Sequence, residues 1–361
     1  MTEAQTAPAA APPAQTPPPW YPPPTPPKKS RAKKILIYVC VLILALSLIL
    51  NAYLGIGLAA MLRGSTMSAT LLRDGDEEQV VATYAIHGMI DSLTAAEFAR
   101  FYRLVRDTPA IKAVVVRVES GGGTVAGSDE IHAMIKKIRQ KLNKPVVISM
   151  GSVAASGGYY LSAPANAIYA EPTTLTASIG VVMPLPVVHD FLKEHGVNMV
   201  MIRSAQSQRY KAAINYFEKP DPEILRARQA LLDEIHETFV DVVKAGRGDK
   251  VKTRPLTVTV TDFDGKDVTR EQTYPFNGQV MMADEARTIG LIDSIGYADD
   301  AIDAAARLAR LDKPRVIQYA RSTGLLNRLL YGPKPDMPVG FDTRMLEQYL
   351  SATPMMIWNG Q

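Results

Sequence analysis

Residues 145–162 read PVVISMGSVAASGGYYLS, and this stretch decides how the neighbouring sequence is expected to fold. The apolar run over 145–150 predicts a buried strand, and the small residues after it predict a turn that enters a helix over 155–162. A strand that passes through a turn into a helix is the first part of a strand–helix–strand unit. We therefore expect parallel strands joined by crossover helices.

The same alternation continues on both sides of this stretch. The first three predicted strands begin about 32 residues apart, and helical patterns separate them. Such alternation is typical of an α/β domain. The strands are expected at 80–86, 113–118, 145–150, 167–170, 179–183 and 198–202, and the helices at 93–106, 125–142 and 155–162.

A long amphipathic helix is predicted farther along the chain. Asp221 and Pro222 are typical of a helix N-cap and first helical position, and apolar residues at helical spacing continue to near Gly246. Residues 247–277 then change to a strand pattern followed by an Asp-Gly turn. This change predicts a hairpin-like insertion.

The N-terminal part of the chain contains two segments of unusual composition. Eleven of the 26 prolines fall within residues 1–27, which have too little apolar surface to fold. No charged residue interrupts 35–62, and these 28 residues exceed the roughly 20 that a helix needs to cross a bilayer. Five basic residues precede the span, so the positive-inside rule predicts a single-pass cell-membrane protein with a cytoplasmic N-terminus. Everything after the span is then extracytoplasmic; a cleaved signal peptide is the alternative.

Charge and cysteine content exclude several classes of function. The net charge of +4 arises within residues 1–34, and the rest of the chain has equal numbers of basic and acidic residues. No nucleic-acid partner is therefore expected. The single cysteine, Cys40, lies in the apolar span, which excludes a disulfide or a cysteine zinc site within one chain. The zinc motif HExxH is absent, and we expect neither a cofactor nor a metal.

Two glycine-rich turns follow predicted strands. Residues 119–124 read ESGGGT and lack the lysine or the glycine spacing of a phosphate loop. Their backbone N–H groups suit an anion that forms only in a transition state, and a plain tight turn is the alternative. In the second turn Ser156 lies among Ala and Gly, so that a substrate chain can approach its hydroxyl. A small-residue helix packed closely against a neighbour explains the same residues.

A serine nucleophile needs a base, because its hydroxyl is protonated at neutral pH. None of the five histidines lies in a glycine turn, and the GxSxG motif is absent. A lysine can serve instead where burial lowers its pKa from about 10.4 towards 7 or 8. Lys211 is flanked by Tyr210 and Ala212 rather than by charges, which makes it a candidate base. An ordinary surface lysine is the alternative.

Together these segments resemble the bacterial signal peptide peptidase A family, membrane-anchored serine proteases with a Ser/Lys dyad. The resemblance rests on 149–160, 174–181 and Tyr210-Lys211. It implies an α/β fold of the ClpP/crotonase-like type, a repeated ββα superhelix with an N-terminal transmembrane helix. The expected domains are a disordered Pro-rich cytoplasmic tail with a basic flank (1–34), the transmembrane anchor (35–62), a linker (63–78), a Ser/Lys peptidase domain (79–312) that contains the insertion 247–277, and a C-terminal tail (313–361).

The resemblance also implies the catalytic roles. Ser156 would be the nucleophile, Lys211 the general base, and Ser178 the residue that hydrogen-bonds the lysine and orients its amine. The reaction would be acyl transfer from a peptide to the serine, followed by hydrolysis.

The oxyanion would be held by the backbone amides of Gly157 and of Gly123, which is preferred over Gly122. The chain departs from the family at Gly121, where a proline is usual, and this departure loosens the turn. It also departs at Arg209, whose charge would favour a neutral Lys211 if it lay beside the amine.

Substrates and partners follow from the same resemblance. The implied substrates are released signal peptides or other unfolded apolar peptides near the membrane, and the implied assembly is a homo-oligomer. The C-terminal stretch 354–358 could lie in the same groove as a substrate, along a strand edge. Alternatives are a dedicated protease of one membrane partner, a non-catalytic scaffold with a crotonase fold, and an acyl-CoA enzyme, which the extracytoplasmic placement argues against.

Overall fold

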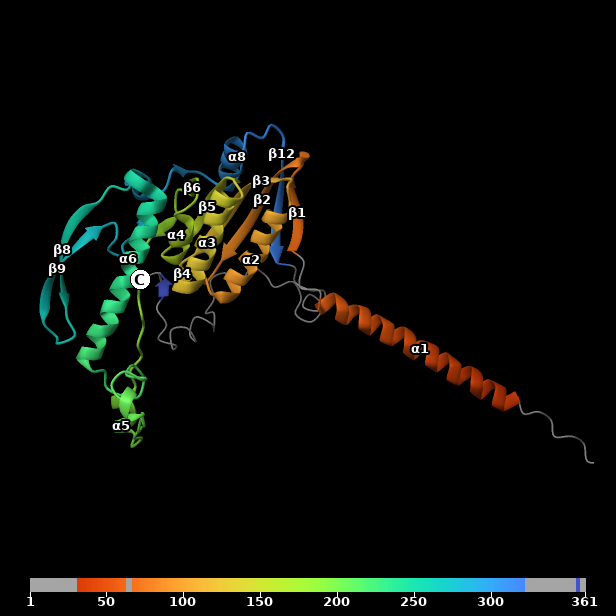
Figure 1. The fold of residues 1–361 in the computed structure, drawn as a ribbon, viewed down its shortest axis with the longest axis horizontal. Helices are drawn as coiled ribbons and strands as arrows, with labels where there is room; N and C mark the ends of the chain where they lie inside the picture. The colour runs from red at the N-terminus through yellow and green to blue at the C-terminus, as the bar shows by residue number, and fades with distance from the viewer. Residues whose placement is uncertain (1–30, 63–66, 322–354, 358–361) are drawn as a thin grey trace, which may run out of the picture. The chain divides into compact units, whose positions relative to one another are not determined.

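The computed structural model describes residues 31–62, 67–321 and 355–357 (Figure 1). The chain divides into two compact units, with the boundary between Gly64 and Ser65. The first unit contains helix α1 (Arg31–Leu62), in which Lys33–Gly57 is long and apolar enough to cross a membrane, with a mean hydropathy of 2.8. Most of the predicted Pro-rich tail lies outside the described residues.

The second unit is built on a nine-stranded mixed sheet. Its main strand order is β1-β12-β2-β3-β5-β6-β11, while β7 pairs with β5 and β10 pairs with β7. The strands β2, β3, β5 and β6 are parallel to one another, which confirms the predicted α/β class and the parallel strands. The strands are β1 (Met67–Arg73), β2 (Asp76–His87), β3 (Ile111–Ser120), β5 (Val146–Ala155), β6 (Ala167–Ala170), β7 (Leu175–Ala177), β10 (Val280–Met282), β11 (Ser294–Ile295) and β12 (Pro314–Arg321).

Successive strand residues point to opposite faces of the sheet. Because the side chains on both faces are apolar, helices cover both faces. Val114, Val116 and Ile148 belong to the large core under one set of helices, whereas Val115 and Val147 pack under α8 (Ala298–Leu308). The helices of the large core are α2 (Ser92–Asp107), α3 (Val125–Lys141), α4 (Gly157–Ser162) and α6 (Pro222–Arg247). The shorter elements are the helices α5 (His189–Glu194) and α7 (Ala283–Thr288) and the 3₁₀ turns Ala205–Ser207 and Gly248–Lys250.

The long helix begins where the sequence predicts. The side chain of Asp221 accepts a hydrogen bond from the amide of Glu223 at 2.8 Å, and Pro222 occupies the first helical position. Near the other end, the almost fully buried Arg247 side chain makes two hydrogen bonds to Asp293, at 2.8 and 3.0 Å. Burial raises the pKa of Asp293, but hydrogen bonds from Arg247 and Lys250 outweigh this effect and lower it to about 2. This ion pair fixes α6 to the loop ahead of β11.

Two predicted strands are wrong. Residues 179–183 form only an isolated bridge at Val182, and the strand lies just before them, at β7. Residues 198–202 form no strand, and Val200 and Ile202 are 79% and 93% exposed. The apolar pattern predicts that these side chains are buried, but the described part of this chain provides no surface that buries them.

The sheet also extends beyond the predicted catalytic range of 79–312. Strand β1 lies in the expected linker, and β12 lies in the expected C-terminal tail, where it pairs with β2 in parallel. Within 247–277, β8 (Arg254–Thr261) and β9 (Asp267–Tyr274) form the antiparallel hairpin that the Asp-Gly turn predicts.

Candidate active site

Ser156 lies at the junction between β5 and α4. Its backbone has φ 53° and ψ −115°, a positive-φ conformation that is strained for a residue with a side chain. The amide of Ser156 donates to the carbonyl of Ala177 at 2.8 Å. Its hydroxyl is completely buried and has no hydrogen-bond partner among the described residues. Strain and an unpartnered buried hydroxyl are both costly, and both are features of reactive residues.

Ser178 occupies the equivalent position after the neighbouring strand. Ala155 pairs with Ala177 in the parallel β5–β7 ladder, so the residues after these two strands lie side by side. Ala177 and Ser178 have positive φ values of 65° and 51°, and the amide of Ser178 donates to the carbonyl of Gln279 at 2.9 Å. The structure therefore brings Ser156 and Ser178 to the same end of the sheet.

The first glycine turn is held by a buried serine that the sequence analysis missed. The Ser120 hydroxyl donates to the carbonyl of Gly88 at 2.6 Å and accepts a hydrogen bond from the amide of Gly122 at 3.0 Å. Gly122 has φ 110°, which favours glycine. Because its amide is engaged by Ser120, Gly122 has no free N–H to offer a ligand.

Gly123 presents its amide to the opposite side of this turn. Ile90 donates to the carbonyl of Gly122 at 2.9 Å and accepts from the amide of Thr124 at 2.8 Å, so both neighbours of Gly123 bond to Ile90. In a parallel bridge of this kind the central residue directs its own N–H and C=O away from the bridge partner. Gly123 lies in β4 (Gly122–Thr124), and its backbone groups face another strand.

That strand is β13 (Met355–Ile357), part of the C-terminal stretch. Met356 is opposite Gly123 in an antiparallel pair, and on the other edge Met355 and Val182 exchange two hydrogen bonds of 2.8 and 2.9 Å. Met355 and Met356 are fully buried. This segment thus lies along the strand edge that we hypothesise for a substrate, while residues 354 and 358 lie outside the described residues.

The carbonyl of Met356 lies in a confined space beside Gly157, the residue that follows Ser156. A Cβ atom on Gly122 would lie 1.8 Å from this oxygen and 2.8 Å from the amide nitrogen of Gly157. A Cβ on Gly157 would lie 3.1 Å from the same oxygen and 3.2 Å from the amide nitrogen of Gly123. Both amides and the carbonyl oxygen therefore surround one small space, and a side chain at position 122 would fill it. Gly157 is the first residue of α4, where amides have no partner within the helix.

A cavity of about 440 Å³ adjoins the buried segment. Its volume is within the range of ligand pockets. On its wall, the hydroxyl of Tyr160 donates to Asp129 at 2.8 Å, and burial raises the pKa of Tyr160, so this hydroxyl stays protonated. The lining residues are Thr124, Val125, Ala126, Asp129, Tyr160, Ile235, Thr238 and Met356.

Lys211 lies apart from this group. It is exposed, and within the described part of the chain no hydrogen bond joins it to Ser156 or Ser178. Figure 1 shows that the segment around α5 stands away from α4 and the sheet. The sequence does not show whether the charge of Arg209 lies beside the Lys211 amine. In the structure Arg209 forms an ion pair with Glu223.

The loop that carries Lys211 is held by Arg203, which the sequence analysis missed. The Arg203 guanidinium donates to the carbonyl of Lys211 at 2.6 Å and to that of Ala212 at 3.0 Å, and it pairs with Glu218. Ala212 has a positive φ of 50°, so the turn after Lys211 is sharply defined. Only the three-dimensional contacts identify Arg203, because its sequence neighbours carry no motif.

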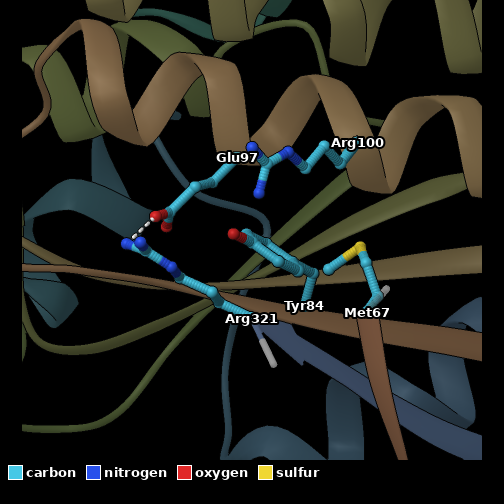
Figure 2. Close-up of a pocket in the computed structure, with 5 residues that line it drawn as sticks. All are labelled: Met67, Tyr84, Glu97, Arg100 and Arg321. Atoms are coloured by element: carbon cyan, nitrogen blue, oxygen red, sulfur yellow. Dashed lines mark hydrogen bonds and ion pairs between the residues drawn. The ribbon is translucent and has the colours of Figure 1, made fainter. Parts of the chain in front are cut away.

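A second cavity lies at the sheet edge near β1 and β12 (Figure 2). Its volume is about 10 Å³, which is room for one water molecule. Glu97 and Arg321 form an ion pair of 2.5 Å across it. Burial, and then the charge of Glu97, raises the pKa of Tyr84 to about 12. This cavity is too small for a peptide and lies away from the glycine turns.

Comparisons with known proteins identify the family of this chain. Residues 138–312 match the model of peptidase family S49. A putative protease of Synechocystis is 31% identical over 236 residues, which are 65% of this chain and 76% of that protein. A putative signal peptide peptidase of Enterococcus faecium is 26% identical over 264 residues, 70% of each chain. Protease 4 of Salmonella typhi is 32% identical over 244 residues, 67% of this chain, but the chain spans only 35% of its length. The chain belongs to peptidase family S49.

Proposed function

We propose that this chain is a serine endopeptidase that cleaves extended apolar peptides. One observation carries the proposal: a peptide segment with a buried methionine pairs with β4, and its carbonyl oxygen lies close to the amides of Gly123 and Gly157. Gly157 directly follows Ser156, whose buried hydroxyl has no partner among the described residues. Strand addition is a general way of binding unfolded peptides, because the backbone supplies the hydrogen bonds and the pockets read the side chains. The 440 Å³ cavity beside Met356 is suited to reading an apolar side chain.

The mechanism that fits this geometry is acyl transfer. Ser156 Oγ attacks the peptide carbonyl carbon, its proton passes to a neutral Lys211 amine, and the two amides stabilise the oxyanion. The lysine then gives the proton to the leaving amine, and water hydrolyses the acyl-enzyme. The Gly122 amide already donates to the Ser120 hydroxyl, so Gly123 is the better candidate for the oxyanion donor in this turn.

The exposed position of Lys211 requires a second copy of the chain in this proposal. A lysine acts as a base near neutral pH only where it is shielded from water. Val200, Ile202 and Tyr210, on the same projecting segment, are large and exposed. Their burial against a neighbouring copy would shield Lys211 and bring it to that copy's Ser156, with Ser178 orienting the amine.

We place this peptidase at the cell membrane, with α1 as a single-pass anchor and the N-terminus in the cytoplasm. The length and composition of Lys33–Gly57 support the anchor, and the basic residues that precede it support the orientation. Released signal peptides are suitable substrates, because they are unfolded, apolar and close to the membrane. A protease dedicated to one membrane partner is the alternative, and substrate profiling distinguishes the two.

A serine-directed probe tests the proposal on the purified full chain. We expect a fluorophosphonate to form a covalent adduct with Ser156, located by mass spectrometry of the digested protein. Because peptide substrate competes for the same site, excess apolar peptide should slow the labelling. An adduct on another serine, or no adduct at all, contradicts the assignment of the nucleophile.

The buried C-terminal segment should compete with substrate. Met356→Asp places a charge in a fully buried position, so we expect the segment to leave the groove and KM for an apolar peptide to fall about 3- to 10-fold, because more of the protein is competent to bind. Removal of residues 350–361 should lower KM by a similar factor. An unchanged KM in both variants means that the segment does not occupy the substrate site in solution.

A further inference from the structure

We infer that Ser128 is a third oxyanion donor, an inference that rests on the proposed function. Among the described residues, two buried hydroxyl groups have no hydrogen-bond partner, those of Ser156 and Ser128. Both lie against Gly157: Ser156 precedes it in the chain, and a Cβ on Gly157 would lie 2.4 Å from Ser128 Oγ. An unpartnered buried hydroxyl is destabilising and calls for an explanation.

Three other buried hydroxyls near this site are engaged. Ser162 donates to the carbonyl of Gly158 at 2.6 Å, Thr174 to that of Gly151 at 2.6 Å, and Thr176 to that of Ala154 at 2.7 Å. Ser128 differs from them because it lies in the first turns of α3, directly after β4, with its hydroxyl towards the glycines of the site. Its free hydroxyl is therefore a property of this site and not of the surrounding core.

The position of the hydroxyl fits a role in the transition state. The same hypothetical Cβ on Gly157 lies near Ser128 Oγ, the Met356 carbonyl oxygen and the Gly123 amide. With a neutral carbonyl in place, Ser128 makes no hydrogen bond. When the carbonyl carbon becomes tetrahedral, its oxygen moves and gains a negative charge, to which a hydroxyl donor binds more strongly. A donor that acts only at that stage raises kcat without changing the binding of the substrate.

Ser128→Ala tests this role, with Ser162→Ala as the matched control, because both remove a fully buried serine hydroxyl, one beside Gly157 and the other bonded to the carbonyl of Gly158. We expect Ser128→Ala to lower kcat by about 10- to 100-fold, with KM changed less than about twofold. A peptide aldehyde, which adds Ser156 Oγ to its carbonyl carbon and leaves an oxyanion, should bind more weakly by the same factor. In a Ser156→Ala background, Ser128→Ala should leave the affinity for an uncleaved peptide unchanged. Ser162→Ala should keep kcat.

The outcomes separate this inference from the proposed function. If the wild type hydrolyses peptide and Ser128→Ala has the same kcat, Ser128 is not a donor. If the loss appears equally in the affinity for the uncleaved peptide, its role is packing, and the inference fails. Ser128→Cys, which keeps the shape of the side chain but is a weak donor, should show the same loss of kcat if the alanine variant unfolds. A wild type that cleaves no peptide overturns the proposed function, and the role of Ser128 with it.

Discussion

Ser156→Ala is expected to lower kcat for an unstructured apolar peptide by about ten-thousand-fold or more, because the proposed mechanism then loses its nucleophile and with it the covalent route. The affinity for an uncleaved peptide should stay the same, since the hydroxyl makes no hydrogen bond with the segment that occupies the groove. The small activity that remains would come from binding and from the oxyanion donors. The measurement is steady-state hydrolysis of a fluorogenic peptide, together with direct peptide binding.

Ser152→Ala is the matched control for this experiment. Ser152 lies four residues earlier on β5, is exposed, and has its hydroxyl bonded to Glu119 rather than directed at the glycines. It should retain wild-type kcat. If Ser156→Ala keeps a rate close to that of Ser152→Ala, another residue is the nucleophile, and the arrangement around Gly157 serves a different purpose.

The sequence predicts the part of the site that depends on local structure. A strand, a run of small residues and a helix place Ser156 at a turn, and these signals are all contained in residues 145–162. Its unusual φ and its buried, unpartnered hydroxyl depend on β7 and β4, which are distant in sequence. They therefore became visible only in the structure.

Residues whose role depends on contacts distant in sequence were missed or misread. Ser128 is an ordinary residue in a helical pattern, and only the absence of a hydrogen-bond partner distinguishes it. Residues 198–202 have the apolar composition of a buried strand. Composition alone does not show which part of the fold, if any, would bury them. Strand β12 lies beyond the last clear repeat, and its parallel pairing with β2 joins segments more than 200 residues apart, which periodicity does not detect.

By itself, Lys211→Met is expected to lower kcat about as strongly as Ser156→Ala, because the proposed mechanism then has no base for the serine hydroxyl. Met has a similar length to Lys but no amine, so it preserves the shape of the side chain. Lys211→Arg should also be inactive, because a guanidinium does not lose its proton in proteins. In contrast, Tyr210→Phe keeps the ring and the lysine and should remain active.

A mixture of the two inactive variants shows which chain supplies the base. If Lys211 acts on Ser156 of a neighbouring copy, chains with Ser156→Ala and chains with Lys211→Met form some sites that contain both an intact serine and an intact lysine. With random mixing of equal amounts, about a quarter of the sites in a closed assembly would be intact, so about a quarter of the wild-type activity should return. If each chain supplies its own lysine, every site in the mixture lacks one group and no activity returns. The exposed Lys211 and the free Ser156 hydroxyl favour a return of activity in the mixture. If that activity returns only after the subunits have exchanged, assembly completes the site.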